Sequence, residues 1–230
     1  MAQDLLELDE ADVVIAAGAD AMTESMLAMI GRFATTRTTQ VRPFDRDRTG
    51  VLLGEGAAAV VLVGERAAPR PALARLLSCG LSCDASHETI PDEGGIVRAM
   101  NEAFARGRRA PADVDLVVAH GTGTALNDPT EALALERVFG ECATRPLITA
   151  IKGAIGHTSG AAALMSVDVG IRCLAGGVVP AIVGLAHPLS EGAGLRFATD
   201  VTSPAPLRLA QINAFGFGGV NAVSLLEATA

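Results

Sequence analysis

The sequence contains no tryptophan and no tyrosine, and its only aromatic residues are seven phenylalanines among 230 residues. Because half of the residues are nevertheless hydrophobic, the core must be built mainly from Ala, Val, Leu and Ile at close helix–sheet spacings. An excess of positive charge is also lacking, since the formal net charge is −8. Phosphate backbones are bound by clustered cationic surfaces, so this composition argues against nucleic acid as a partner.

Long apolar runs are absent as well. No run approaches the roughly 20 residues that span a bilayer. The acidic start, Met1 to Asp4, lacks the basic and then apolar pattern of a signal peptide. We therefore expect no membrane span, no secretion signal and a cytoplasmic location.

Cysteine is scarce, and its spacing is uninformative. The four cysteines are Cys79, Cys83, Cys142 and Cys173, and they do not form the paired short spacings of a zinc site or a secreted disulfide framework. A ligand set of Cys79, Cys83 and His87 is conceivable but has no second cluster. We expect structural thiols, with no metal and no resident cofactor.

Lysine is almost missing, and the single exception is Lys152. An apolar run, 147–151, leads into it, and His157 follows at a glycine-flanked turn. A compact ammonium differs from a guanidinium in size, hydration and ease of pKa tuning, so a lysine there indicates a chemical role. Chance retention of one lysine is the alternative, and only the neighbouring motifs can decide between them.

Strand-like and helix-like segments alternate along the chain, which predicts one α/β domain with a mixed sheet covered by helices. Two apolar runs, 13–17 and 57–63, are typical of strands buried on both faces. Asp128 is expected to cap a helix whose first turn contains Pro129. The remaining predicted strands are 73–81, 114–119, 146–151, 210–214 and 221–226, the last two as an antiparallel hairpin. The predicted helices are 4–10, a Met-rich segment to residue 30, 95–106, 128–139 and 159–174, and an ordered loop is expected over 32–49.

Three predicted strands run out into glycine-rich turns that carry polar or aromatic groups. These turns are 119–124 with His120, 152–157 with Lys152 and His157, and 213–219 with two phenylalanines. Ligands of open α/β sheets bind outside the carboxyl ends of strands, where glycines allow close backbone approach. Each turn alone is weak evidence, but together they predict a catalytic pocket.

Together the three turns resemble the motifs of the β-ketoacyl synthase (ketosynthase) family of the thiolase superfamily. The resemblance rests on the first histidine motif, 118–124 with Asp128, on the lysine and second histidine motif, 152–157, and on the Gly-Phe-Gly-Phe-Gly-Gly loop within 213–221. Earlier segments, 11–21, 42–45 and 54–58, also match in the family's order. The resemblance implies a partial thiolase-like αβαβα fold in which the first half of the duplication is missing. Residues 1–66 would end the N-terminal half, and 67–230 would form the C-terminal half.

The family resemblance also implies roles for individual residues. His120 and His157 would stabilise the enolate formed by decarboxylation of a malonyl thioester, and Lys152, paired with Glu131, would orient them. Asp128 would support this site. Substrates would arrive on the phosphopantetheine of an acyl carrier protein, in fatty-acid or polyketide biosynthesis. The implied substrate-binding residues are Thr122, Thr124, Phe215, Phe217 and Gly218.

Some of these implied roles have plain structural alternatives. The Phe215 N–H would complete an oxyanion hole and its ring would act as a gate, whereas Phe217 could simply pack in the core. The two threonines could cap a strand. Arg42 is a candidate for docking the acidic carrier protein, and Arg46 and Arg48 could equally lie in a solvated loop.

Ketosynthases hold the acyl chain on a cysteine at a helix N-terminus, and alignment of the motifs places that cysteine just before Met1. Three hypotheses follow for the chain. It could be a subunit of a split ketosynthase whose partner bears the cysteine, a non-catalytic structural or regulatory subunit, or an inactive gene fragment. The split-ketosynthase hypothesis predicts a hetero-oligomer, because the elements that cover 13–17 and 57–63 would belong to the partner.

Overall fold

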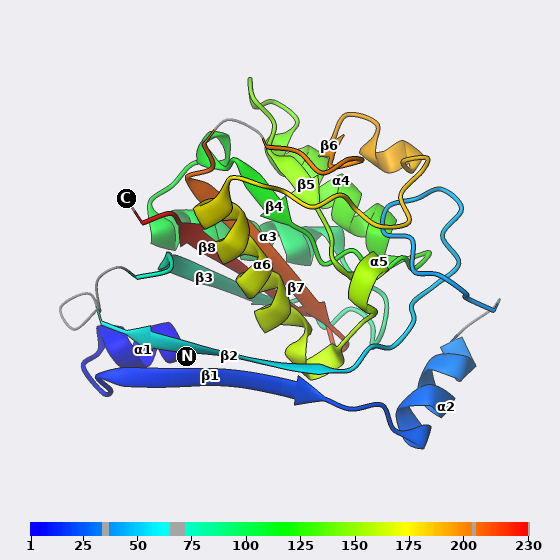
Figure 1. The fold of residues 1–230 in the computed structure, drawn as a ribbon, viewed down its shortest axis with the longest axis horizontal. Coiled ribbons are helices and arrows are strands. Elements are labelled where there is room, and N and C mark those ends of the chain that lie inside the picture. Colours follow the sequence, from blue (N-terminus) through cyan, green and yellow to red (C-terminus); the bar gives the residue numbers. More distant parts are fainter. Residues whose placement is uncertain (34–36, 65–71, 204–205, 230) are drawn as a thin grey trace.

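The computed structural model describes residues 1–33, 37–64, 72–203 and 206–229. Its main sheet has six strands in the order β3-β8-β7-β4-β5-β6, and a separate two-stranded ribbon pairs β1 with β2 (Figure 1). β4, β5, β6 and β7 are parallel, whereas β8 runs antiparallel to both β7 and β3. This arrangement confirms the predicted mixed α/β sheet and the C-terminal hairpin. The strands are β1 Val13–Asp20, β2 Gly56–Val63, β3 Arg75–Cys83, β4 Leu116–Val118, β5 Leu147–Thr149, β6 Arg196–Phe197, β7 Leu209–Gly216 and β8 Val220–Glu227.

Helices cover both faces of the main sheet. α3 and α4 pack on one face, and α6 lies between the other face and the β1–β2 ribbon (Figure 1). The three residues of β4 show how the strand serves both cores: Leu116 and Val118 join the α6 side, and Val117 joins the α3–α4 side, as side chains alternate along a strand. The helices are α1 Ala2–Glu7, α2 Glu24–Phe33, α3 Glu93–Gly107, α4 Asn127–Phe139, α5 Lys152–Ile155 and α6 Ala162–Gly176, with 3-10 turns at Pro111–Asp113, Ser159–Ala161 and Ser190–Gly192.

Two predicted helix starts differ from the structure. α4 begins at Asn127 with Leu126 at the N-cap, so Asp128 lies inside the first turn instead of capping it. Its carboxylate is withdrawn from capping because it binds backbone N–H groups of the 122–123 turn and of Phe44. The helix predicted from residue 159 starts as the 3-10 turn Ser159–Ala161 and becomes α6 only at Ala162.

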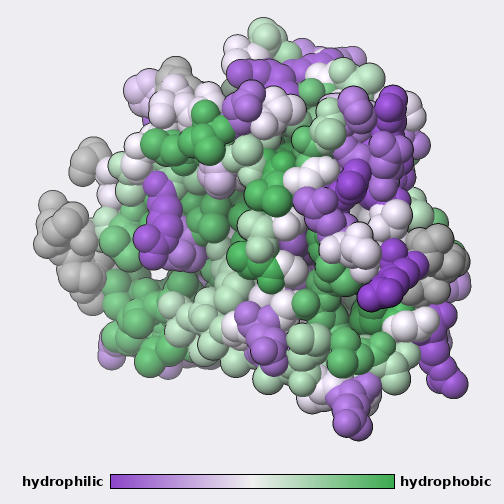
Figure 2. Space-filling view, turned by 45° about the vertical axis from the view of Figure 1, so that its right-hand side comes forward, coloured by the Kyte–Doolittle hydropathy of each residue, from purple (hydrophilic) through white to green (hydrophobic). Residues whose placement is uncertain are grey.

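The prediction that 13–17 and 57–63 are strands buried on both faces is wrong for the chain as described. β1 and β2 pair antiparallel, and along β1 exposed residues alternate with half-buried ones. Ile15 and Val61, which are directly opposite each other, are 68% and 66% exposed. Hydrophobic residues gather along the lower side of the molecule in Figure 2, the level at which the ribbon lies in Figure 1.

Several expectations fall on residues outside the described ranges. The proposed boundary between 66 and 67 lies within 65–71, and the loop expected over 32–49 includes 34–36. In the ranges that the structure does describe, none of the helices has the length and apolar character needed to cross a bilayer.

Candidate active site

The two histidines singled out from the sequence meet in the structure. His120 follows β4, His157 follows α5, and their ring centroids lie 5.4 Å apart at an interplanar angle of 81°. The Phe215 ring, near the end of β7, lies 5.3 Å from the His120 ring. A cavity of about 230 Å³ opens between these groups and the first turns of α6. The carboxyl ends of two parallel strands and the start of a helix thus converge, as expected for a ligand site in an α/β sheet.

The hydrogen bonds of both imidazoles define which nitrogen carries the proton. His157 Nδ1 accepts the backbone N–H of Ser159 at 3.0 Å. His120 Nδ1 lies 3.4 Å from both Lys152 Nζ and the Phe215 backbone nitrogen, which are donors. A neutral imidazole that accepts at Nδ1 carries its proton at Nε2. Each ring therefore has an Nε2–H group free of these contacts.

Both imidazoles are held in the neutral form. Burial, and then the positive charge of Lys152, lower the pKa of His157 to about 4. Burial lowers the pKa of His120 well below its ordinary value, with Lys152 and His157 contributing in the same direction. Burial is therefore the main cause of the lowered His157 pKa. At neutral pH the pair can donate hydrogen bonds but holds no ionic charge.

Lys152 and Glu131 both bind the backbone of His120. Lys152 Nζ donates to the backbone carbonyl of His120, while Glu131 Oε1 accepts the backbone N–H of His120 at 2.8 Å. The described residues include no direct ion pair between Lys152 and Glu131 within 4.0 Å, so the predicted pairing acts through the His120 peptide instead. Burial lowers the pKa of Lys152 to about 8, opposed by the nearby carboxylates.

Asn213 is a member of this network that sequence reasoning missed. Its side-chain amide donates to Glu131 Oε1 at 3.0 Å and accepts from Gln211 at 2.8 Å. Asn213 and Gln211 are both buried in β7. Two amide side chains at alternate positions of an otherwise apolar strand were the available signal, because buried amides need specific partners.

Asp128 organises the turn that carries the two threonines. Its carboxylate accepts the backbone N–H groups of Thr122 and Gly123 and the Thr122 hydroxyl. Since Thr122 donates to Asp128, the 2.9 Å contact between the threonine hydroxyls must use the Thr124 proton. Thr124 Oγ1 also accepts the Asn127 N–H at the start of α4. The two hydroxyls thus bind within the turn and at the start of α4 instead of capping a strand, and toward a ligand they can act only as acceptors.

Of the two phenylalanines in the glycine-rich loop, Phe215 lines the cavity and Phe217 does not. The Phe215 N–H points at His120 Nδ1, so it is not the uncommitted oxyanion donor that was predicted. The core-packing alternative for Phe217 is wrong, because this residue is 59% exposed. Gly218 adopts a φ of 83°, a left-handed conformation that suits glycine, and its N–H donates to Glu88.

The three arginines of the 42–48 segment also separate. Arg48 donates to the carbonyl oxygens of Thr124 and Asp45, so the solvated-loop alternative is wrong for it. Arg46 is exposed and Arg42 half-buried. Of the three, Arg48 therefore helps to hold the threonine turn, and the other two remain available at the surface.

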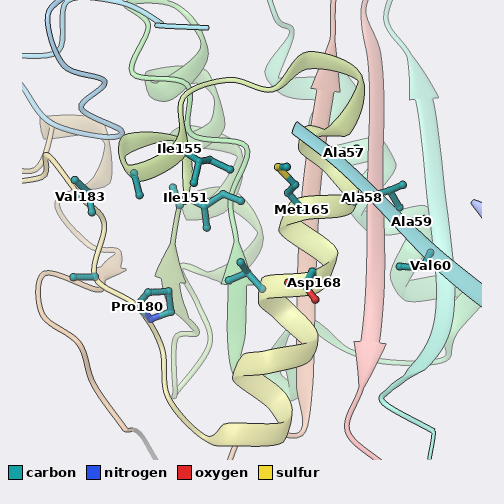
Figure 3. A pocket seen from close by; sticks show the side chains of 15 residues that line it. Ala57, Ala58, Ala59, Val60, Ile151, Ile155, Met165, Asp168, Pro180 and Val183 are labelled. Carbon is teal, nitrogen blue, oxygen red and sulfur yellow. The ribbon is translucent and has the colours of Figure 1, made fainter. Parts of the chain in front are cut away.

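A larger cavity of about 570 Å³ lies beside β2, between β2, α5 and α6 (Figure 3). Its labelled lining is apolar apart from Asp168, which pairs with Arg172 at 2.7 Å. General acid–base or oxyanion chemistry needs convergent polar groups. The smaller cavity, with two histidines and a lysine, is therefore the candidate active site in spite of its size.

None of the four cysteines lines the smaller cavity. Cys173 is buried in α6, and burial raises its pKa to about 11, which disfavours the reactive thiolate. Cys79 lies 3.3 Å from the Ser224 hydroxyl, and Cys83 contacts the carbonyl of Gly218. Among the described residues, no group of three His, Cys, Asp or Glu side chains has the arrangement of a metal site.

Known proteins resemble this chain in both sequence and fold. Residues 1–68 match the family model described as "Beta-ketoacyl synthase, N-terminal domain", and residues 73–186 match the corresponding C-terminal domain. Nodulation protein E of Rhizobium leguminosarum bv. trifolii is 36% identical over 229 residues, covering 96% of this chain and 56% of that protein. A 3-oxoacyl-[acyl-carrier-protein] synthase 2 of Coxiella burnetii is 34% identical, covering 95% and 56%. The solved structure titled "The ishigamide ketosynthase/chain length factor" superposes with a TM-score of 0.91 at 33% identity, covering 99% of this chain and 57% of that one.

The chain thus spans a little over half the length of the relatives that it matches.

Proposed function

The chain belongs to the β-ketoacyl synthase family, of which it spans a C-terminal part with a thiolase-like α/β fold, and we propose that it supplies the decarboxylation site of a ketosynthase. The substrate is a malonyl thioester carried by the phosphopantetheine of an acyl carrier protein. The observation that carries this proposal is the pair of neutral imidazoles, His120 and His157, each with its Nε2–H uncommitted to the neighbours that fix its tautomer.

In the proposed reaction, the bond between the malonyl Cα and its carboxylate breaks and CO2 leaves. The electron pair moves onto the thioester as an enolate, whose oxygen receives hydrogen bonds from the two Nε2–H groups. The enolate carbon then attacks an acyl thioester on a cysteine, the thiolate leaves, and the β-ketoacyl product stays on the carrier. Neutral donors suit this role, because they stabilise the developing oxyanion without delivering a proton to the carbanion.

Lys152 and Glu131 act as positioning residues in this proposal. By holding the His120 carbonyl and N–H, respectively, they set the direction in which the imidazole leaves the backbone. The threonine hydroxyls at Thr122 and Thr124 would accept N–H groups of the pantetheine arm, and Arg42 would meet the acidic carrier protein. In this proposal these contacts would hold the pantetheine arm and the carrier, while the thioester reaches the histidines.

The acyl-bearing cysteine comes from outside these 230 residues, and we place it on a cysteine-bearing ketosynthase part that covers the ribbon. Whether that part is a separate chain or a segment of the same polypeptide is decided by the size of the native protein. A second candidate is a non-catalytic subunit, favoured by one observation: a similar solved structure is titled as a ketosynthase/chain length factor assembly. Retention of the two histidines and Lys152 favours the catalytic role, since a structural subunit has no need of them.

The test measures CO2 release from malonyl carrier protein by the chain assembled with the cysteine-bearing part. His120→Ala and His157→Ala should each slow decarboxylation by about 100-fold or more, because each removes an oxyanion donor. His187→Ala is the matched control, since the His187 side chain is exposed and outside the cavity. Unchanged CO2 release in both site variants would sink the proposed function.

A further inference from the structure

One polar residue of the active-site cavity has no use in the reaction as described so far. Ser166 lies on α6, and with Ala162 and Ala163 it forms the helical wall of the cavity. The residue is only 1% exposed. Its hydroxyl makes no hydrogen bond to any described residue. The described side-chain atoms that are both fully buried and without a hydrogen-bond partner are Gln3 Oε1 and Gln211 Oε1, so the Ser166 oxygen keeps a small accessible area. The small part of Ser166 that is accessible therefore opens onto the cavity.

A hydroxyl without a hydrogen-bond partner is energetically unfavourable at this buried position. Burying a hydroxyl without a hydrogen bond is unfavourable by about 1–3 kcal/mol, and alanine occupies both neighbouring wall positions, Ala162 and Ala163. Ser159 is the other serine of the cavity, but it is half-exposed, so water can satisfy it. Among the described lining residues, Ser166 thus has the one buried hydroxyl without a hydrogen-bond partner.

The remaining lining limits what that ligand can be. Two imidazole Nε2–H groups are assigned to the thioester oxygen. The Lys152 ammonium is engaged by the His120 carbonyl, so no free cation faces the cavity from its described lining. A malonyl thioester also has a carboxylate, and the described lining leaves only neutral groups to donate a hydrogen bond to it.

We propose that Ser166 is a further substrate-binding residue, whose hydroxyl donates a hydrogen bond to the carboxylate of the malonyl group. This inference rests on the proposed function and names the residue that selects its substrate. A neutral donor holds the carboxylate in place without the strong ground-state stabilisation of an ion pair, so departure of CO2 is not opposed. When the Cα–carboxylate bond breaks, the hydroxyl keeps its proton, and the electron pair passes to the enolate at the histidines.

The experiment compares binding of malonyl-pantetheine and acetyl-pantetheine, which differ by the carboxylate. Affinity is measured by titration calorimetry on the chain assembled with the cysteine-bearing part, the same assembly that is used for CO2 release. We expect Ser166→Ala to weaken binding of malonyl-pantetheine about tenfold or more, as for a hydrogen bond to a charged group, and to leave acetyl-pantetheine unchanged. Ser166→Cys keeps the volume and a weak donor, so it should fall between the two.

Ser159→Ala is the matched control, because it removes the other cavity hydroxyl and should preserve the preference. Thermal unfolding adds an independent readout: loss of an unpartnered hydroxyl should leave Ser166→Ala as stable as the parent or more so. Equal loss of both ligands, or loss of the preference in Ser159→Ala alone, would overturn the assignment. A wild-type chain that does not prefer malonyl-pantetheine would overturn it too. Failure of CO2 release with the preference intact would instead count against the proposed function only.

Discussion

At the scale of single residues, His120 is controlled through its backbone. A carboxylate and an ammonium, both buried, bind the N–H and C=O groups of one residue. Neither Glu131 nor Lys152 reaches the other directly, so each charge is compensated through a shared peptide and through further donors such as Asn213. Arginine is too large and too rigidly forked for this compact contact, which explains why this position carries lysine instead of arginine.

The neutral state of His157 leads to a prediction about acid stability. In the folded chain its pKa is about 4, whereas the ordinary value is 6.5. Between these pH values the unfolded chain takes up a proton that the folded chain does not, so the free energy of unfolding should fall as pH falls through this window. A shift of this size corresponds to at most about 3 kcal/mol.

Chemical denaturation at several pH values checks this dependence. His157→Asn should reduce the decline between pH 6.5 and 4 without abolishing it, because His120 also has a lowered pKa. His187→Asn, with an exposed ring, should retain the full decline. The other titratable groups around His157 are Lys152, His120 and Asp20, and they are common to all three proteins. Parallel curves for the parent and His157→Asn would contradict the neutral-imidazole assignment.

Much of the site could be predicted at this scale, and the exceptions have a common cause. His120 and Lys152 follow strands β4 and β5, and His157 follows the short helix α5 that replaces most of the predicted turn. All three lie near glycines, a local pattern, and the structure brings them together. The partners of Phe215 N–H and of the threonine hydroxyls depend on segments far away in sequence. Hydrogen-bond direction is not encoded locally, so these contacts could not be read from the turns themselves.

At the scale of elements, β1 controls the turn that follows His157. An ideal Cβ on Gly18 would lie 2.2 Å from the carbonyl oxygen of Gly160, in the 3-10 turn Ser159–Ala161. The Asp20 carboxylate accepts the Gly160 N–H at 3.1 Å from the same strand. The ribbon therefore supports the site directly, although it contributes no side chain to the cavity lining.

Gly18→Ala tests this support. The added methyl group must displace backbone, so we expect a loss of about 1–3 kcal/mol in the free energy of unfolding and slower CO2 release. Gly31→Ala in α2 is the matched control, because nothing lies within 4 Å of its added Cβ. This control should be neutral or more stable by about 0.5–1 kcal/mol, as usual for glycine to alanine in a helix. Equal behaviour of the two variants in urea denaturation would show that the ribbon does not buttress the turn.

The order of elements could be predicted from the sequence, but the surroundings of β1 and β2 could not. Apolar runs of this kind indicate burial on both faces, and that pattern holds for β4, which is covered by helices on each side. The ribbon has the same composition without the covering layer. The composition of a strand indicates whether it is suited to burial. It does not indicate which part of the protein covers it.

At the scale of the whole molecule, the β1–β2 ribbon presents an exposed apolar surface. Val13, Ile15 and Val61 are each more than half exposed. The other edge of β2 borders the large apolar cavity of Figure 3. Two-stranded ribbons are marginally stable alone, and contiguous exposed apolar patches mark interaction sites. The N-terminal family domain matches only residues 1–68 here, so the cysteine-bearing part is the proposed cover for this face.

The final prediction concerns association of the chain on its own. With this face open, the 230-residue chain should self-associate, and co-expression with the cysteine-bearing part should replace self-association by a defined complex. Ile15→Lys and Val61→Lys put charge on facing positions of the ribbon, so each should favour the monomer and also prevent assembly with that part. Leu133→Lys is the control, since Leu133 is 44% exposed but lies on α4, far from the ribbon in the fold. Sedimentation velocity distinguishes the outcomes: a parent chain that is monomeric at tens of micromolar, or ribbon variants that still assemble, would show that this face is complete without a cover.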